Sequence, residues 1–80
     1  MDEQIKELTL LLLYLTSWTE KELGADYQRA WKGYDFNVLN KLKDERLIGG
    51  SSYKSKSIYL TEDGIGKATE LMEKYNIIGL

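Results

Sequence analysis

An α+β fold is predicted for this chain of 80 residues by three patterns that follow one another in its second half. Residues 36–48 have the spacing of an amphipathic helix. A Gly-Gly pair and a polar stretch tipped with lysines follow at 49–57, as in a short hairpin. Residues 58–64 combine an apolar strand end with a helix start. This order is typical of the back half of a winged helix-turn-helix. We therefore expect one domain over 1–80, with a helical core and an antiparallel wing sheet of two or three strands.

The first helix is expected from Asp2 to about Trp18, because Asp2 suits an N-cap and apolar residues then recur at helical spacing. One stripe holds Ile5, Leu8, Leu12 and Leu15, while Leu10, Leu13 and Tyr14 are apolar on other faces. A domain this small cannot wrap a helix on every side. We favour a homodimer through this helix. The alternative is that Leu10 and Leu13 are covered by the tail residues Ile77, Ile78 and Leu80.

The segment 19–34 carries mixed signals. Thr19 and Glu22 fit a capping box, which predicts a helical turn over 20–23, and Gly24 can close that turn in a left-handed conformation. Residues 25–34 are compatible with a short second helix, a small strand at the edge of the wing sheet, or an ordered loop. The sequence leaves these three alternatives open.

Two further helices begin at clear cap residues. Asp35 is a good N-cap for a helix that runs to about Arg46, and Thr61 caps the last helix, which Asn76 can end in a left-handed conformation. The apolar side of the first of these helices is formed by Phe36, Val38, Leu39 and Leu42, and that of the second by Ile65, Ala68, Leu71, Met72 and Tyr75.

Two strands are expected between these helices. Leu47 and Ile48 leave the helix into a strand, and Gly49-Gly50 permits a bulge or a close backbone approach. The chain returns over 57–60, with Ile58 and Leu60 on one face of the sheet and Tyr59 on the other.

Composition excludes several kinds of site. The chain has no cysteine and no histidine, which removes disulfides, thiolate metal sites and the usual general base. Because no nucleophile set, metal-ligand cluster or phosphate loop is present, we expect no enzyme, cofactor or metal. The apolar run Leu8–Leu15 is too short for a bilayer and lacks a positive flank, so we expect a cytoplasmic protein without membrane contact.

Charge is distributed unevenly along the chain. Residues 27–57 carry seven Lys or Arg against three acidic residues, although the net charge of the whole chain is −2. The basic excess therefore lies in the expected recognition helix and wing, which indicates a nucleic-acid surface there.

The candidate DNA contacts fall into three groups. Asn37, Asn40 and Lys41 share the polar side of the helix at 35–46, where Asn can pair with adenine and Lys with guanine or phosphate. Lys54 and Lys56 at the wing, with Arg29 and Lys32 before the helix, suit phosphate. The alternatives are a plain solvated helix face, which Asp44 and Glu45 favour, and a hairpin made soluble by lysine.

Residues 29–35, Arg-Ala-Trp-Lys-Gly-Tyr-Asp, form the most unusual stretch of the chain. Its aromatic residues could stack on bases or help to hold a phosphate. We favour a structural role instead, in which Trp31 fills the core beneath the last helix, Gly33 supplies a turn and Asp35 caps the next helix.

This stretch resembles a family of short, uncharacterised prokaryotic proteins that carry an R-A-W-K-G-aromatic-D motif. The likeness continues through Leu47-Ile48 and the Leu-Thr-Glu-x-Gly run of residues 60–64. The combination of Leu47-Ile48 with the run at residues 60–64 is also similar to winged-helix regulators of the MarR and PadR type. Those regulators usually have glycine where this chain has Arg46. The resemblance implies a winged-helix fold and no particular activity. The regulators also have a clear positioning helix, for which only 25–34 is available here.

We therefore expect a small homodimeric winged-helix protein that binds duplex DNA, in the manner of a transcriptional regulator. The main alternative is a protein-interaction module with the same fold, which the acidic balance and the apolar first helix favour. A third hypothesis is a small-molecule sensor with a pocket formed by Trp18, Trp31 and Tyr75.

Overall fold

The computed structural model describes residues 2–22, 25–50 and 56–77, and it confirms the α+β class. The described elements, in chain order, are α1 (Asp2–Leu15), β1 (Trp18–Glu22), β2 (Ala25–Trp31), α2 (Phe36–Asp44), β3 (Ile48–Gly49), β4 (Ser57–Leu60) and α3 (Glu62–Lys74). The strands form one antiparallel sheet in the order β1-β2-β4-β3. The sheet therefore has four strands among the described residues, where two or three were expected.

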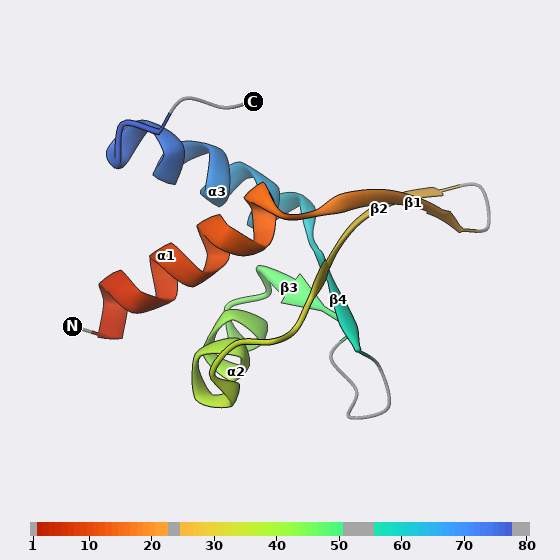
Figure 1. Cartoon of the computed structure of the whole chain (residues 1–80), viewed down its shortest axis with the longest axis horizontal. Coiled ribbons are helices and arrows are strands. Elements are labelled where there is room, and N and C mark those ends of the chain that lie inside the picture. The colour runs from red at the N-terminus through yellow and green to blue at the C-terminus, as the bar shows by residue number, and fades with distance from the viewer. Residues whose placement is uncertain (1, 23–24, 51–55, 78–80) are drawn as a thin grey trace.

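The helices pack beside one face of this sheet. α1 lies beside α3 and also contacts α2 and β2, while the β1–β2 hairpin extends away from the helices (Figure 1). The core contains Ala30, Ile48, Ile58 and Leu60 from the strands together with Leu39, Leu42, Ala68 and Leu71 from α2 and α3. Since side chains alternate along a strand, the residues next to Ala30, Ile58 and Leu60 point to the opposite, outer face.

The helical turn predicted over 20–23 is wrong for its described part, because residues 20–22 belong to β1. Thr19 does not act as a cap: its hydroxyl donates to the side chain of Gln28, its cross-strand partner. A capping signal needs a helix to follow it, and here the antiparallel partner strand satisfies the backbone groups instead.

Of the three alternatives for 25–34, the strand is confirmed for 25–31. It does not lie at the edge of the sheet, since β2 pairs with β1 on one side and with β4 on the other. Between α1 and α2 the described residues form these two strands, and the chain enters α2 from β2 through residues 32–35. This entry differs from the two consecutive helices of a helix-turn-helix.

The elements after residue 35 agree with the sequence-based predictions. An Asp35 carboxylate oxygen accepts from the backbone N–H groups of Asn37 at 2.9 Å and Val38 at 3.2 Å, which caps α2. The Thr61 hydroxyl accepts from the Gly64 N–H at 2.9 Å, which caps α3. Phe36, however, is 71% exposed and does not join the apolar side of α2.

A residue in the left-handed conformation follows each of two helices, α2 and α3. Asn76 has φ 55° after α3, as predicted. Arg46 has φ 61° just after α2, at the position where the regulators usually have glycine. A non-glycine residue is uncommon in this conformation, but here it is the geometry that turns the chain from α2 into β3.

The α1 residues that were expected to form the dimer surface lie in the core instead. Leu10 and Leu13 are buried in the core, at 1% and 0% exposure, so they cannot form the proposed dimer surface. Their cover comes from the helices and the sheet, with Ile77 packed against the core; Ile78 and Leu80 lie outside the described residues. α1 also ends at Leu15, because Trp18 begins β1. Among the described helices, none is long and apolar enough to cross a membrane.

Candidate nucleic-acid interface

The polar side of α2 is exposed, as predicted. Asn37, Asn40 and Lys41 all lie on the solvent side of the helix, while Leu39 and Leu42 bury the opposite side. Asn37 and Lys41 also line a groove of about 640 Å³. Its other lining residues are Ile5 and Lys6 from α1 with Asp35 and Val38. The groove therefore lies between α2 and the first half of α1.

The second group of candidates gathers around the start of β4. The Lys32 N–H donates to the Lys56 carbonyl oxygen at 3.1 Å, which places the two lysines on adjacent chain segments. Arg29 lies on β2, where its guanidinium is 3.4 Å from the Ser57 hydroxyl and 3.5 Å from a Glu20 carboxylate oxygen. Lys54 lies outside the described residues.

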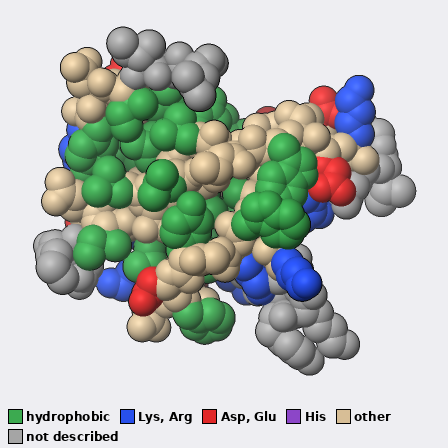
Figure 2. All heavy atoms as spheres, viewed as in Figure 1, with side chains coloured by type: hydrophobic (Ala, Val, Ile, Leu, Met, Phe, Trp, Pro, Cys, Tyr) green, Lys and Arg blue, Asp and Glu red, His purple; other side chains and the backbone are tan. Residues whose placement is uncertain are grey.

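Pairing of strands explains why Lys56 lies beside the segment that carries Arg29 and Lys32. Arg29 and Lys32 are three residues apart in sequence, but Lys56 comes 24 residues later and joins them because β4 pairs with β2. Figure 2 shows Lys and Arg side chains gathered below the strand pair on the viewed face. α2 and the start of β4 project toward the same, lower side of the molecule (Figure 1).

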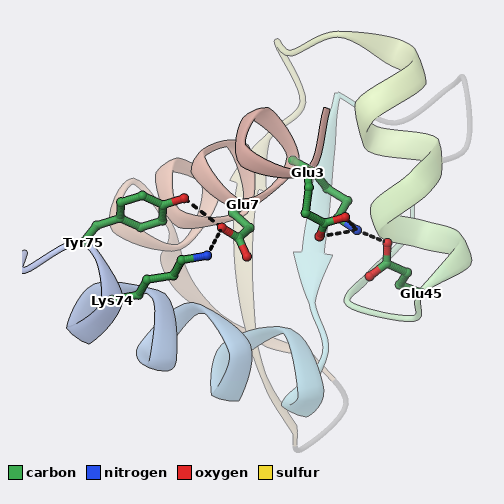
Figure 3. Close-up of polar contacts among 6 residues, drawn as sticks. Glu3, Glu7, Glu45, Lys74 and Tyr75 are labelled. Carbon is green, nitrogen blue, oxygen red and sulfur yellow. Dashed lines mark hydrogen bonds and ion pairs between the residues drawn. The ribbon is translucent and has the colours of Figure 1, made fainter. Parts of the chain in front are cut away.

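Several nearby carboxylates are already engaged. Asp35 caps α2, and Glu20 pairs with Arg29. Glu45, expected to repel phosphate, forms an ion pair with Lys6 of α1, which also bonds to Glu3 at 2.9 Å (Figure 3). These carboxylates raise the pKa of Lys6, the bond to Glu45 contributing most. Asp44 is exposed near the end of α2 and still supports a solvated helix face.

The outer face of the sheet is aromatic, which sequence reasoning missed. Trp31 is 62% exposed, so the prediction that it fills the core beneath the last helix is wrong. Its ring lies 5.1 Å from that of Trp18, and the Tyr27 and Tyr59 rings are 5.5 Å apart. The spacing of two between Tyr27, Arg29 and Trp31 is the signal that could have identified this face.

The three aromatic residues proposed for a sensor pocket do not meet in one site. Trp18 and Trp31 lie on the outer face of the sheet, whereas Tyr75 lies at the end of α3 and donates to a Glu7 carboxylate oxygen at 2.7 Å. Lys74 donates to the same oxygen at 2.8 Å, and Figure 3 shows both residues reaching from α3 toward Glu7 on α1. The Lys74 ammonium and, next, the Tyr75 hydroxyl lower the pKa of Glu7. This cluster joins two helices.

Comparison with known proteins identifies the family. The family described as "Domain of unknown function (DUF6429)" matches residues 1–78. The chain belongs to the DUF6429 family. It is also similar to "Uncharacterized protein y4hR" from Sinorhizobium fredii (strain NBRC 101917 / NGR234), with 33% identity over 73 residues, covering 91% of this chain and 89% of that protein. No solved structure matches the chain.

Two glycine positions give the second half of this DUF6429 protein its close packing. A Cβ on Gly49 would lie 2.6 Å from the Tyr59 hydroxyl oxygen, so the ring of Tyr59 rests directly on this backbone. A Cβ on Gly64 would overlap the carbonyl oxygen of Leu47. Residues 47–48 and 61–64 are therefore in contact, which fixes the start of α3 against the strand pair.

The described part of this DUF6429 protein shows no group of three or more His, Cys, Asp or Glu side chains that could hold a metal ion. Six of the seven predicted contact residues can be located. They form two groups, one on α2 and one at the junction of β2 and β4, linked by the four residues 32–35.

Proposed function

We propose that this protein binds duplex DNA in a winged-helix manner, with α2 in the major groove and the β2–β4 junction on the phosphate backbone. Asn37, Asn40 and Lys41 would meet base edges, and Arg29, Lys32 and Lys56 would meet phosphates. The single observation that supports this most is the backbone hydrogen bond between Lys32 and Lys56. It holds Lys56, just before β4, beside Lys32, just before α2.

The dimensions and charges of this surface favour duplex DNA. The major groove is about 12 Å wide and admits one α-helix, whose early residues reach the base edges. Asn37 and Asn40 precede Lys41, which lies in the last turn of α2, and all three are on the side opposite the buried Leu39 and Leu42. The ion pair between Glu45 and Lys6 reduces one source of repulsion toward phosphate.

Anisotropy titration of a labelled, mixed-sequence DNA duplex tests the proposal at several salt concentrations. We expect binding at low salt that weakens as salt rises, because phosphate contacts release counterions. The double variant Lys32→Ala and Lys56→Ala should bind more weakly at every sequence, with a salt slope reduced by about 2, roughly one per phosphate contact.

The matched control is the double variant Lys21→Ala and Lys67→Ala, which removes the same charge at exposed positions on β1 and α3. It should retain most of the affinity and the slope. If the two double variants change the slope equally, the β2–β4 junction has no special role. If the unmodified protein fails to bind DNA at low salt, the proposal is wrong.

Protein interaction is the second candidate function, favoured by the large side chains that the fold leaves in solvent. Trp31 and Phe36 are 62% and 71% exposed. Aromatic residues of this kind are enriched at protein interfaces, where they supply much of the binding energy. An absence of DNA binding, with Trp31 and Phe36 still exposed, would favour this function.

A further inference from the structure

An apolar stripe on α1 remains exposed after the domain has folded. Ile5, Leu8, Leu12 and Leu15 are between 38% and 46% exposed. The positions beside the stripe, Gln4, Thr9 and Thr16, are uncharged. The successive spacings are three, four and three residues, as in the a and d positions of a coiled coil.

The other described elements leave this stripe more than a third exposed. It extends over about 15 Å, at 1.5 Å per residue from Ile5 to Leu15. The remaining described elements pack mainly on the other side of α1, around Leu10 and Leu13, although Ile5 at one end of the stripe also lines the groove beside α2.

The pattern of the stripe points to a second copy of this chain. Spacings of three, four and three read the same in both directions, so an identical helix turned end to end presents a matching row of side chains. Two-fold symmetric dimers require such a self-complementary surface. An uncharged stripe also brings no like charges together when it meets itself.

We propose that two copies pair through antiparallel α1 helices, with Ile5 facing Leu15 of the partner copy and Leu8 facing its Leu12. Antiparallel pairing aligns the helix dipoles favourably. It also separates the acidic ends of the two helices, where Glu3 is exposed, whereas parallel pairing would place these ends side by side. This interface differs from the Leu10 and Leu13 surface predicted from sequence. Its Ile5 end borders the groove lined by Asn37 and Lys41, whereas Leu8, Leu12 and Leu15 are not among the residues that line that groove.

The apolar surface extends beyond the stripe on the same face. Figure 2 shows hydrophobic side chains over α1 and, further along, over the β2 region. Contiguous exposed apolar patches of more than about 300–600 Å² usually mark an interaction site. A second copy docked on α1 would cover the exposed parts of Ile5, Leu8, Leu12 and Leu15.

Sedimentation equilibrium of the full chain without DNA tests the proposal. We expect a mass of twice 9.3 kDa at micromolar concentrations. Leu8→Glu and Leu12→Lys should each give the monomer mass with an unchanged far-UV circular dichroism spectrum, because both side chains are already partly in solvent. Thr69→Glu adds a charge at an exposed position on α3 and should remain dimeric.

Mixing the two charged variants tests the orientation. Leu8→Glu and Leu12→Lys chains should form a heterodimer, since antiparallel pairing places the new charges opposite each other. If either charged variant loses its fold, Leu8→Cys and Leu12→Cys chains replace it, because the natural chain has no cysteine. Their mixed oxidation should then give mainly the heterodimer.

Three results would overturn the inference. One is a monomeric natural protein at all concentrations, and another is a charged stripe variant that stays dimeric. The third is a mixture that gives no preference for the heterodimer, which would exclude antiparallel pairing. None of these readouts involves DNA, so failure of the dimer and failure of the proposed function are distinguishable.

Discussion

The two faces of α1 have similar composition and opposite environments. One face contributes Leu10, Leu11 and Leu13 to the core, with at most 2% exposure. The other face contributes the stripe from Ile5 to Leu15, whose aliphatic side chains are more than a third exposed. Both faces consist mainly of leucine, so hydrophobicity alone does not determine which face is buried. The difference comes from where α3, α2 and β2 pack.

Polar residues show the same contrast. Glu7 lies on the buried side, at 8% exposure, and bonds to both Lys74 and Tyr75 of α3. Gln4 and Thr16 flank the exposed stripe and are themselves exposed. The buried face of α1 is therefore specified by both close packing and a paired charge, whereas the exposed face retains only an apolar pattern.

The largest expected effect comes from truncating the buried face. Leu13→Ala should reduce the free energy of unfolding by about 2–5 kcal/mol, because it removes a fully buried side chain and leaves a cavity. Leu12→Ala, on the exposed face, should cost about 1 kcal/mol or less in the monomer. Urea unfolding at low protein concentration measures both values. Equal costs for the two variants would contradict the distinction between the faces.

A second effect tests the close packing that fixes the start of α3 against Leu47, just before β3. Gly64→Ala should destabilise the fold by about 1–3 kcal/mol, since its Cβ would overlap backbone at Leu47 and cannot be relieved by a rotamer change. Gly66→Ala is the matched control in the same helix, where a Cβ meets nothing within 4 Å. It should stabilise the fold by about 0.5–1 kcal/mol. Thermal unfolding of both variants would reveal whether the two glycines differ in sign.

The smallest expected effect concerns the carboxylate of Glu7, on the buried side of α1. Lys74 and Tyr75 hold the pKa of Glu7 below its ordinary value of 4.5, so the fold favours the ionised carboxylate. The stabilisation is therefore present above the pKa of the unfolded chain and is lost as pH falls through the lower pKa of the folded chain. Between pH 7 and pH 3, the natural protein should lose more stability than Glu7→Gln does.

Urea midpoints across this pH range provide the measurement for Glu7. Glu70→Gln serves as the control, because it removes an exposed carboxylate elsewhere on α3. The control should follow the pH dependence of the natural protein. Parallel curves for the natural protein and Glu7→Gln would mean that the α1–α3 cluster contributes nothing to the acid response.

In the second half of the chain, local signals were sufficient to predict the helix caps, the left-handed residue after α3 and the buried face of β4. Asp35 and Thr61 cap α2 and α3 as expected, Asn76 adopts the left-handed conformation, and Ile58 and Leu60 are buried on one face of β4. Each of these features depends on residues within one turn or one strand. A cap or an alternating pattern is therefore readable without knowing what packs on it.

Residues 19–31 were not predictable in the same way. Thr19 has a capping signal, yet it pairs with Gln28 across a hairpin, and that hairpin is held in the sheet by β4, about 30 residues further on. Among the candidate contacts, the meeting of Lys32 and Lys56 also depends on this pairing. Strand pairing over such distances depends on which partners the complete fold offers, so local propensity does not decide it.

The amino-acid sequence by itself determined the α+β class, the positions of the three helices and the placement of basic residues in the middle of the chain. Tertiary structure alone decided which leucines of α1 are buried and on which face Trp31 lies, and it brought Lys56 beside Lys32. The physical reason is that caps and periodicity act over a few residues. Burial and strand pairing depend on contacts between segments distant in sequence.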